Sequence, residues 1–343
     1  AIAIVAMFSA GAANAVILDG DSQGDHVRLY GEVGVGGHFD THPDYNHDEF
    51  YDTKGYVDDS FATMGVSGQR EKFTYRLELD YQRRNWLGGD GEFELAIDKL
   101  YVGYRLTEQQ WVELGLTDTA FDDYEHFGDF TFNKSIETGE AGDQENTVKY
   151  QAKFEHLIAG VSYSYDGEHK SGALQGDIIN GYVGWMSDLL SVVVGLETRG
   201  GSNGVSKYGE QQQIGLGARL KLMPEFSIGV NGFIEDEDLS TRKSGDVHLD
   251  YQTFRNQGVT VSAKYDLNEH WEIISSVNHE EYEGWDLISP NYDYSELPPE
   301  YGKERQWASL GFNYRPARDI VLSLEGRVGE APEAGYAYVR MYF

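Results

Sequence analysis

The side chains of this 343-residue sequence that could take part in acid–base or metal chemistry are ten histidines and 58 aspartates and glutamates. The histidines are scattered, with no recurrent spacing to a serine or an aspartate of the kind a hydrolytic site requires. They are His26, His38, His42, His47, His126, His156, His169, His248, His270 and His279. This distribution argues against an enzyme and favours a protein that acts without catalysis.

Many of the acidic residues stand in short runs between apolar segments. Such runs occur within residues 44–52, 235–238 and 280–283. Carboxylate oxygens suit hard divalent cations, although the spacing here matches no defined calcium loop, so solvated charge is the simpler interpretation and no metal site is predicted. The net charge of -31 excludes a nucleic-acid partner, because binding a phosphate backbone requires clustered lysine and arginine.

The elements that would position these residues are β-strands. In residues 72–82 every odd position from 73 to 81 is apolar or aromatic and every even one is polar, which gives a strand one apolar and one charged face. The same alternation recurs around residues 27–35, 214–222, 310–314 and 337–343. No stretch reaches the roughly 18 consecutive apolar residues of a membrane-spanning helix. A helical membrane protein is therefore excluded.

Sixteen segments carry the strand pattern. We expect strands over residues 26–39, 57–69, 71–82, 93–106, 109–117, 144–154, 157–166, 175–187, 189–199, 209–222, 225–235, 251–266, 270–282, 303–315, 318–329 and 334–343. Their connections alternate between turns of a few residues and loops of about eight to over twenty residues, an asymmetry typical of outer-membrane barrels. The sequence predicts an all-β protein, a transmembrane antiparallel β-barrel of about 16 strands.

The first fifteen residues resemble the end of a secretory signal. An apolar run over residues 1–10 is followed by Ala13-Asn14-Ala15, a cleavage site of the Ala-x-Ala type. We therefore predict a partial signal peptide over residues 1–15 and a single barrel domain over residues 16–343. Three tryptophans beside predicted short turns, Trp111, Trp185 and Trp271, are expected to form an aromatic girdle at one membrane interface.

Several of these segments resemble the general diffusion porins of Gram-negative bacteria. Asn-Thr-Val-Lys-Tyr at 146–150 resembles the family's Asn-Ser-Val-Arg-Tyr strand, and Leu-Tyr-Val-Gly-Tyr at 100–104 resembles Ala-Tyr-Val-Gly-Leu. Residues 114–122 resemble the family's lead-in to a third loop that folds into the lumen. The motifs occur in the family's order, and the chain has a C-terminal phenylalanine. The resemblance implies an inward-folded third loop, and it implies that Phe343 is an assembly signal for the barrel-assembly machinery.

The resemblance also implies a pore constriction, where acids on the third loop face bases on the opposite wall. The loop carries Asp118, Asp122, Asp123, Glu125 and Asp129. The basic wall looks depleted, with Arg28, Arg76 and Lys149 as the candidates that alternation leaves and Asp98 where the family tends to have a base. The register of the strand over 93–106 is open, because the alternation slips between Ile97 and Leu100, as it does at a β-bulge.

The expected function is a water-filled channel in the cell outer membrane for small hydrophilic solutes and ions, mildly cation-selective, without a cofactor. A homotrimer follows from the resemblance alone, and outer-membrane lipid and lipopolysaccharide are the expected surroundings. An oligosaccharide-selective porin is the alternative within transport, although Trp86, Trp285 and Trp307 are too scattered for a continuous sugar track. An outer-membrane enzyme and an adhesive surface protein are the alternatives from other classes.

Overall fold

The computed structural model describes most of the chain, and the structural statements below concern that part. The described residues are 16–20, 25–40, 55–83, 93–132, 136, 141–168, 174–200, 211–239, 252–284, 303–331 and 333–343. The predicted signal peptide over residues 1–15 lies outside them, as do Trp86 and Trp285. No helix in these ranges has the length and apolar character needed to cross a membrane.

Strands make up nearly all of the described structure. Their bounds are β1 Val16–Gly20, β2 His26–Asp40, β3 Gly55–Asp58, β4 Phe61–Arg70, β5 Phe73–Arg83, β6 Phe93–Thr107, β7 Gln110–Asp118, β8 Asp143–Phe154, β9 Leu157–Glu168, β10 Leu174–Trp185, β11 Leu190–Arg199, β12 Gln211–Met223, β13 Phe226–Leu239, β14 Gln252–Asp266, β15 Trp271–Gly284, β16 Lys303–Ala317, β17 Ile320–Gly329 and β18 Glu333–Tyr342. A short 3-10 helix, η3 (Asp122–Tyr124), follows β7.

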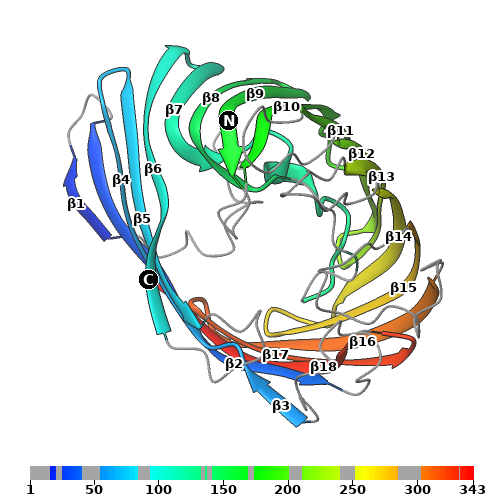
Figure 1. Ribbon diagram of the computed structural model, residues 1–343. Helices are drawn as coiled ribbons and strands as arrows, with labels where there is room; N and C mark the ends of the chain where they lie inside the picture. Colours follow the sequence, from blue (N-terminus) through cyan, green and yellow to red (C-terminus); the bar gives the residue numbers. More distant parts are fainter. Residues whose placement is uncertain are drawn as a thin grey trace.

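The strands form a closed antiparallel ring (Figure 1). From β4 to β18 each strand pairs with the next one in the chain, and β2 pairs with β4 on one side and with β18 on the other. The sixteen predicted strands are confirmed, with two differences. The segment expected over residues 57–69 is divided into β3 and β4, and the short strand β1 is additional, pairing with the start of β2.

The seam of the barrel joins the two ends of the chain. Tyr342 pairs with Glu32, and Phe343 exchanges two backbone hydrogen bonds of 2.9 and 3.0 Å with Gly31. Farther along β2, Val16 of β1 pairs with Leu29. β1 and the C-terminal residue therefore occupy successive positions along β2, and the last residue completes the closure of the sheet.

Side chains of opposite polarity cover the two faces of the wall. On β5 and β7 the large apolar side chains point outward, with Leu77 38% and Leu114 60% exposed. The inward positions are polar, as in Ser162, Asn180 and Thr260, which are at most 2% exposed. An apolar exterior and a polar interior are what a barrel in a bilayer requires, because lipid can cover only the outer face.

The slip in the alternation of β6 is a β-bulge. Glu78 of β5 lies opposite Lys99, but the next residue, Leu79, lies opposite Ile97, so Asp98 is the extra residue. The bulge keeps Ile97 and Leu100 on the outer face, where they are 50% and 52% exposed. As a result Lys99 turns inward, a placement that simple alternation did not give.

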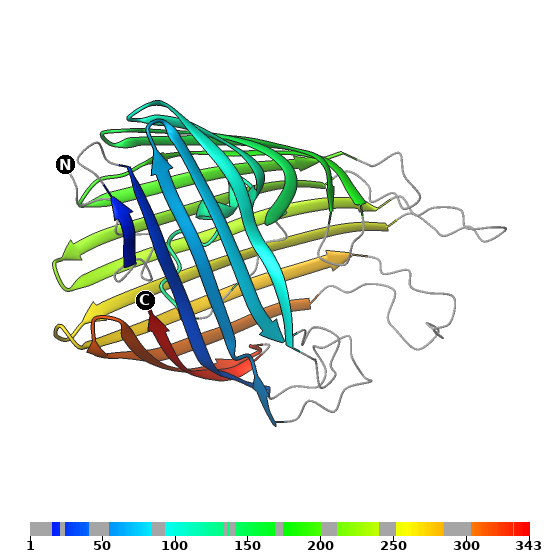
Figure 2. The same ribbon diagram turned by 90° about the vertical axis from the view of Figure 1, so that its left-hand side faces the viewer.

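The short connections lie together at one end of the barrel, at the left in Figure 2. Trp185 and Trp271, each beside a short turn, are 51% and 42% exposed on the outer face, as expected for an interfacial girdle. The prediction for Trp111 is wrong. Its indole N–H donates to Glu113 at 3.2 Å, and it pairs with Gln151, so it shares the inner face of β7.

Candidate functional site

The described residues of the connection between β7 and β8 lie inside the ring of strands (Figure 1). We call residues 119–142 the inner loop; residues 119–132, 136, 141 and 142 of it are described. Its backbone is bound by polar side chains of successive wall strands. The N–H of Ala120 donates to Ser162 Oγ at 2.9 Å, the N–H of Phe121 donates to Asn180 Oδ1 at 3.1 Å, and Ser262 Oγ donates to the carbonyl of Gly128 at 2.9 Å.

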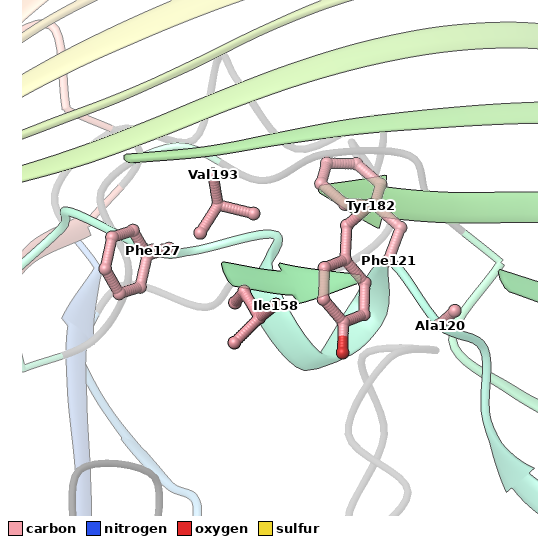
Figure 3. Close-up of a cluster of buried hydrophobic side chains, with 6 residues drawn as sticks. All are labelled: Ala120, Phe121, Phe127, Ile158, Tyr182 and Val193. Atoms are coloured by element: carbon pink, nitrogen blue, oxygen red, sulfur yellow. The ribbon is translucent and has the colours of Figure 1, made fainter. Parts of the chain in front are cut away.

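Glycines on the inner face make room for this loop. A Cβ atom at Gly195 or Gly215 would overlap the ring of Phe121, and one at Gly217 would overlap the carbonyl of Phe127. Phe121 therefore lies directly on the backbone of β11 and β12. Together with Ala120 and Phe127 it forms a buried cluster with three wall residues, Ile158, Tyr182 and Val193 (Figure 3). Burial of these aromatic rings anchors the loop to the wall.

The beginning of the inner loop is held by charge. Lys99 Nζ lies 3.1 Å from Asp98 and also forms ion pairs with Asp118 and Asp143, so one ammonium group joins the ends of β7 and β8 to the bulge of β6. The Lys99 side chain is only 8% exposed. Sequence reasoning missed this residue, although the slip in alternation was the signal that could have revealed it.

A second ammonium group lies next to the first. Lys149 Nζ is 3.3 Å from Asp123 and 3.5 Å from Glu113, and Gln151 also donates to Asp123. Burial raises the pKa of Asp123 to about 6, an effect that the charge of Lys149 only partly offsets. Lys149 thus lies under the inner loop and holds it, instead of facing it across the pore.

The remaining predicted acids of the loop differ in their surroundings. Asp122 lies within 4.8 Å of carboxylate oxygens of Asp118 and Asp143. Glu125 Oε1 lies 2.7 Å from His126 Nε2. Asp129 departs from the expectation of a water-facing acid, because it is 1% exposed and accepts hydrogen bonds from the N–H and the hydroxyl of Thr131 at 2.8 and 2.7 Å. Its carboxylate orders the loop backbone.

The wall formed by β2, β4, β5 and β6 carries the other predicted residues. Arg28 is exposed on the inner face of β2, opposite Ser67. Arg76 lies 2.7 Å from Glu78 and donates to the Tyr30 hydroxyl at 2.6 Å. A carboxylate triad, Glu78, Asp80 and Asp98, brings its oxygens within 4.8 Å of one another. Two carboxylate triads on the described residues, this one and Asp118–Asp122–Asp143, are thus linked by Lys99.

Phe132 is the residue of the inner loop that reaches β17, on the β18 side of the seam, and we call it the far end of the loop. The N–H of Phe132 donates to Glu325 Oε2 on β17 at 3.0 Å. Between β7 and β17 the loop follows the inner face of β9 to β14. The pore lining that remains is the wall from β18 through β2, β4, β5 and β6, together with the loop.

A closed barrel with an apolar exterior, a polar interior and a loop across its lumen is the architecture of an outer-membrane channel. The chain belongs to the Gram-negative porin family, which it matches over residues 1–326. Membership places the protein in the outer membrane and confirms the family indicated by the sequence motifs.

Solved structures of similar fold are porins and other outer-membrane proteins. Salmonella typhi OmpF in complex with daunomycin has a TM-score of 0.67 at 12% identity, covering 96% of this chain and 100% of that one. OmpT of Vibrio cholerae in a trimer form has a TM-score of 0.63 at 13% identity, covering 93% and 99%. The anion-selective porin of Comamonas acidovorans has a TM-score of 0.61 at 13% identity, covering 93% and 100%. At these identities the likeness concerns the fold alone.

Proposed function

We propose that the protein is a passive diffusion channel for small hydrophilic solutes and ions, with a mild preference for cations. One observation supports the preference. Five carboxylates at the start of the inner loop form ion pairs with only two ammonium groups, Lys99 and Lys149. The carboxyl groups of Asp118 and Asp143 share one proton through a hydrogen bond, so this group has an excess of two negative charges next to the water-filled passage.

The size of the effect follows from Coulomb's law. A carboxylate about 8 Å from the ion path in water contributes roughly 0.5 kcal/mol, and physiological salt reduces this to about 0.2 kcal/mol. Two such charges give about 0.4 kcal/mol, or roughly a twofold preference. Acids on the opposite wall, such as Asp80, add to it, and Arg28 reduces it.

The test is the reversal potential in a salt gradient across a planar bilayer. We expect the sign of a cation-preferring pore, with potassium about twice as permeant as chloride. A preference for chloride would contradict the proposed selectivity. A purified, folded protein that gives no conductance would contradict the channel itself.

The oligosaccharide-selective alternative receives no support from Trp307. Trp307 does lie on the inner face, as its alternation predicts, but it is 3% exposed and packs with Phe233 and Ala331. A buried indole cannot stack on a passing sugar ring.

We propose that the protein has no catalytic activity, and a hydrolase screen of the purified chain tests this.

The assembly of the protein is part of the proposal. We propose a homotrimer surrounded by outer-membrane lipid and lipopolysaccharide, since the chain belongs to the porin family and OmpT of Vibrio cholerae, which has a similar fold, was solved in a trimer form. A heat-sensitive band of three times the monomer mass on an unheated gel tests it.

We also propose Phe343 as the residue recognised by the barrel-assembly machinery, because its backbone completes the seam. Deleting Phe343 should reduce the folded yield in cells.

A further inference from the structure

The far end of the inner loop meets the wall through an aromatic ring and a guanidinium group. The ring of Phe132 lies 4.3 Å from Cζ of Arg340 on β18 and 5.1 Å from the ring of Tyr338. Its N–H is bound by Glu325 on the neighbouring strand, β17. One residue of the loop is therefore held by side chains of two adjacent strands.

Arg340 is itself oriented by the residues around it. Its guanidinium lies 5.7 Å from the ring of Phe61 on β4 and 5.6 Å from that of Tyr338, and its Nε lies 3.5 Å from Glu32 on β2. A planar cation can stack on several rings at once, an arrangement that a lysine ammonium cannot reproduce with the same geometry. The side chain is 28% exposed, so the group also borders the lumen.

The contact between Phe132 and Arg340 lies at the edge of the passage through the barrel. The described part of the loop follows the inner face from β9 to β14 and reaches β17 and β18 at Phe132, so the passage is bounded by the loop and by β18, β2, β4, β5 and β6. The stack of Phe132 on Arg340 lies at one corner of that boundary. The start of the loop, at the opposite corner, is held by Lys99 and Lys149.

We propose that Arg340 is a positioning residue that fixes the far end of the inner loop and thereby limits the size of the solutes that pass. The inference rests on the proposed diffusion function, because a size limit has meaning only for a diffusion channel. Without the guanidinium group, Phe132 loses its cation–π contact with β18. The loop end is then less firmly held, and the corner of the passage widens.

The test compares charge-matched variants in liposomes and bilayers. Arg340→Met and Phe132→Leu should each raise the swelling rate with a neutral disaccharide, relative to a pentose, by about twofold or more. Arg28→Met removes the same charge from the neighbouring strand β2 without touching the described part of the loop. It should shift the ion preference as Arg340→Met does, while its disaccharide-to-pentose ratio should rise by less than half as much as that of Arg340→Met.

The double variant Arg340→Met/Phe132→Leu should match the stronger single variant, because both changes break one contact. Equal sugar ratios for Arg340→Met and Arg28→Met, or an unaltered ratio for Phe132→Leu, would overturn the inference. If Arg340→Met fails to fold, Phe132→Leu carries the test, since Phe132 lies outside the strands. An unaltered protein that passes no pentose would contradict the diffusion function instead.

Discussion

The inner wall of the barrel has two halves of different chemistry. From β9 to β14 it presents small residues, such as Ser162, Gly195 and Gly217, which accept the backbone and rings of the inner loop at close range, and Arg219, whose guanidinium stacks on the rings of Phe127 and Phe130. From β2 to β6 it presents charged groups, such as Arg76 and Asp80, which face the passage. In the proposed channel, one half of the wall therefore builds the constriction and the other half acts on passing ions.

The difference shows what each half tolerates. On the small-residue half the limiting factor is volume, because an added methyl group meets the loop. On the charged half the limiting factor is charge balance, because acids outnumber bases around Lys99. Substitutions that change volume and substitutions that change charge should therefore have separate effects.

The largest effect is expected for Lys99→Met. Removing the ammonium group leaves Asp98, Asp118 and Asp143 close together without their shared partner, and loss of one member of a buried ion pair costs about 3 kcal/mol of stability. Urea unfolding in detergent should show the loss, and bilayer recordings should show a stronger cation preference. Arg28→Met, which removes an exposed charge on the same half, is the control and should cost less than about 1 kcal/mol. Equal losses for the two variants would contradict the role given to Lys99.

Gly217→Ala should have the next largest effect. The added methyl group would overlap the carbonyl of Phe127, so the loop must move, at a cost of about 1–3 kcal/mol. Single-channel conductance should change because the loop forms one side of the passage. The matched control is Gly311→Ala, another inner-face glycine, where the new Cβ would lie at an ordinary 3.4 Å from its nearest neighbour. If both variants conduct like the unaltered protein, the small-residue half does not position the loop.

The sequence predicted the strands and the faces of their residues better than it predicted the contacts between those residues. Alternation and turn spacing were enough for the strands and for the inner faces of Arg28, Arg76 and Lys149, because these depend on local periodicity. The partners of Lys99 and the buried position of Asp129 depend on contacts between residues far apart in the chain. Local periodicity cannot report such contacts, and the bulge at Asp98 reverses the faces that follow it.

Asp80→Asn should have a small effect confined to selectivity. Asp80 belongs to the charged half, where its carboxylate accepts a hydrogen bond of 2.6 Å from Thr63. Removing one charge near the ion path should lower the ratio of cation to anion permeability by a factor of about 1.4, given about 0.2 kcal/mol per screened charge. Reversal potentials measure the ratio, and conductance should stay nearly constant because the two side chains have similar volumes. A large change in conductance would show that Asp80 supports the wall structure instead.

The smallest effect is expected from pH and concerns Asp123, where the two halves meet. Burial raises the pKa of Asp123 to about 6, so its carboxyl is about nine-tenths ionised at pH 7 and about nine-tenths protonated at pH 5. Acidification over this range removes one negative charge beside Lys149, and the cation preference should therefore fall as the pH falls from 7 to 5. Asp123→Asn should show the lower preference already at pH 7 and a flatter profile. An identical pH profile for this variant would mean that another group titrates, and the excess charge would then have to be sought on the β2 to β6 wall.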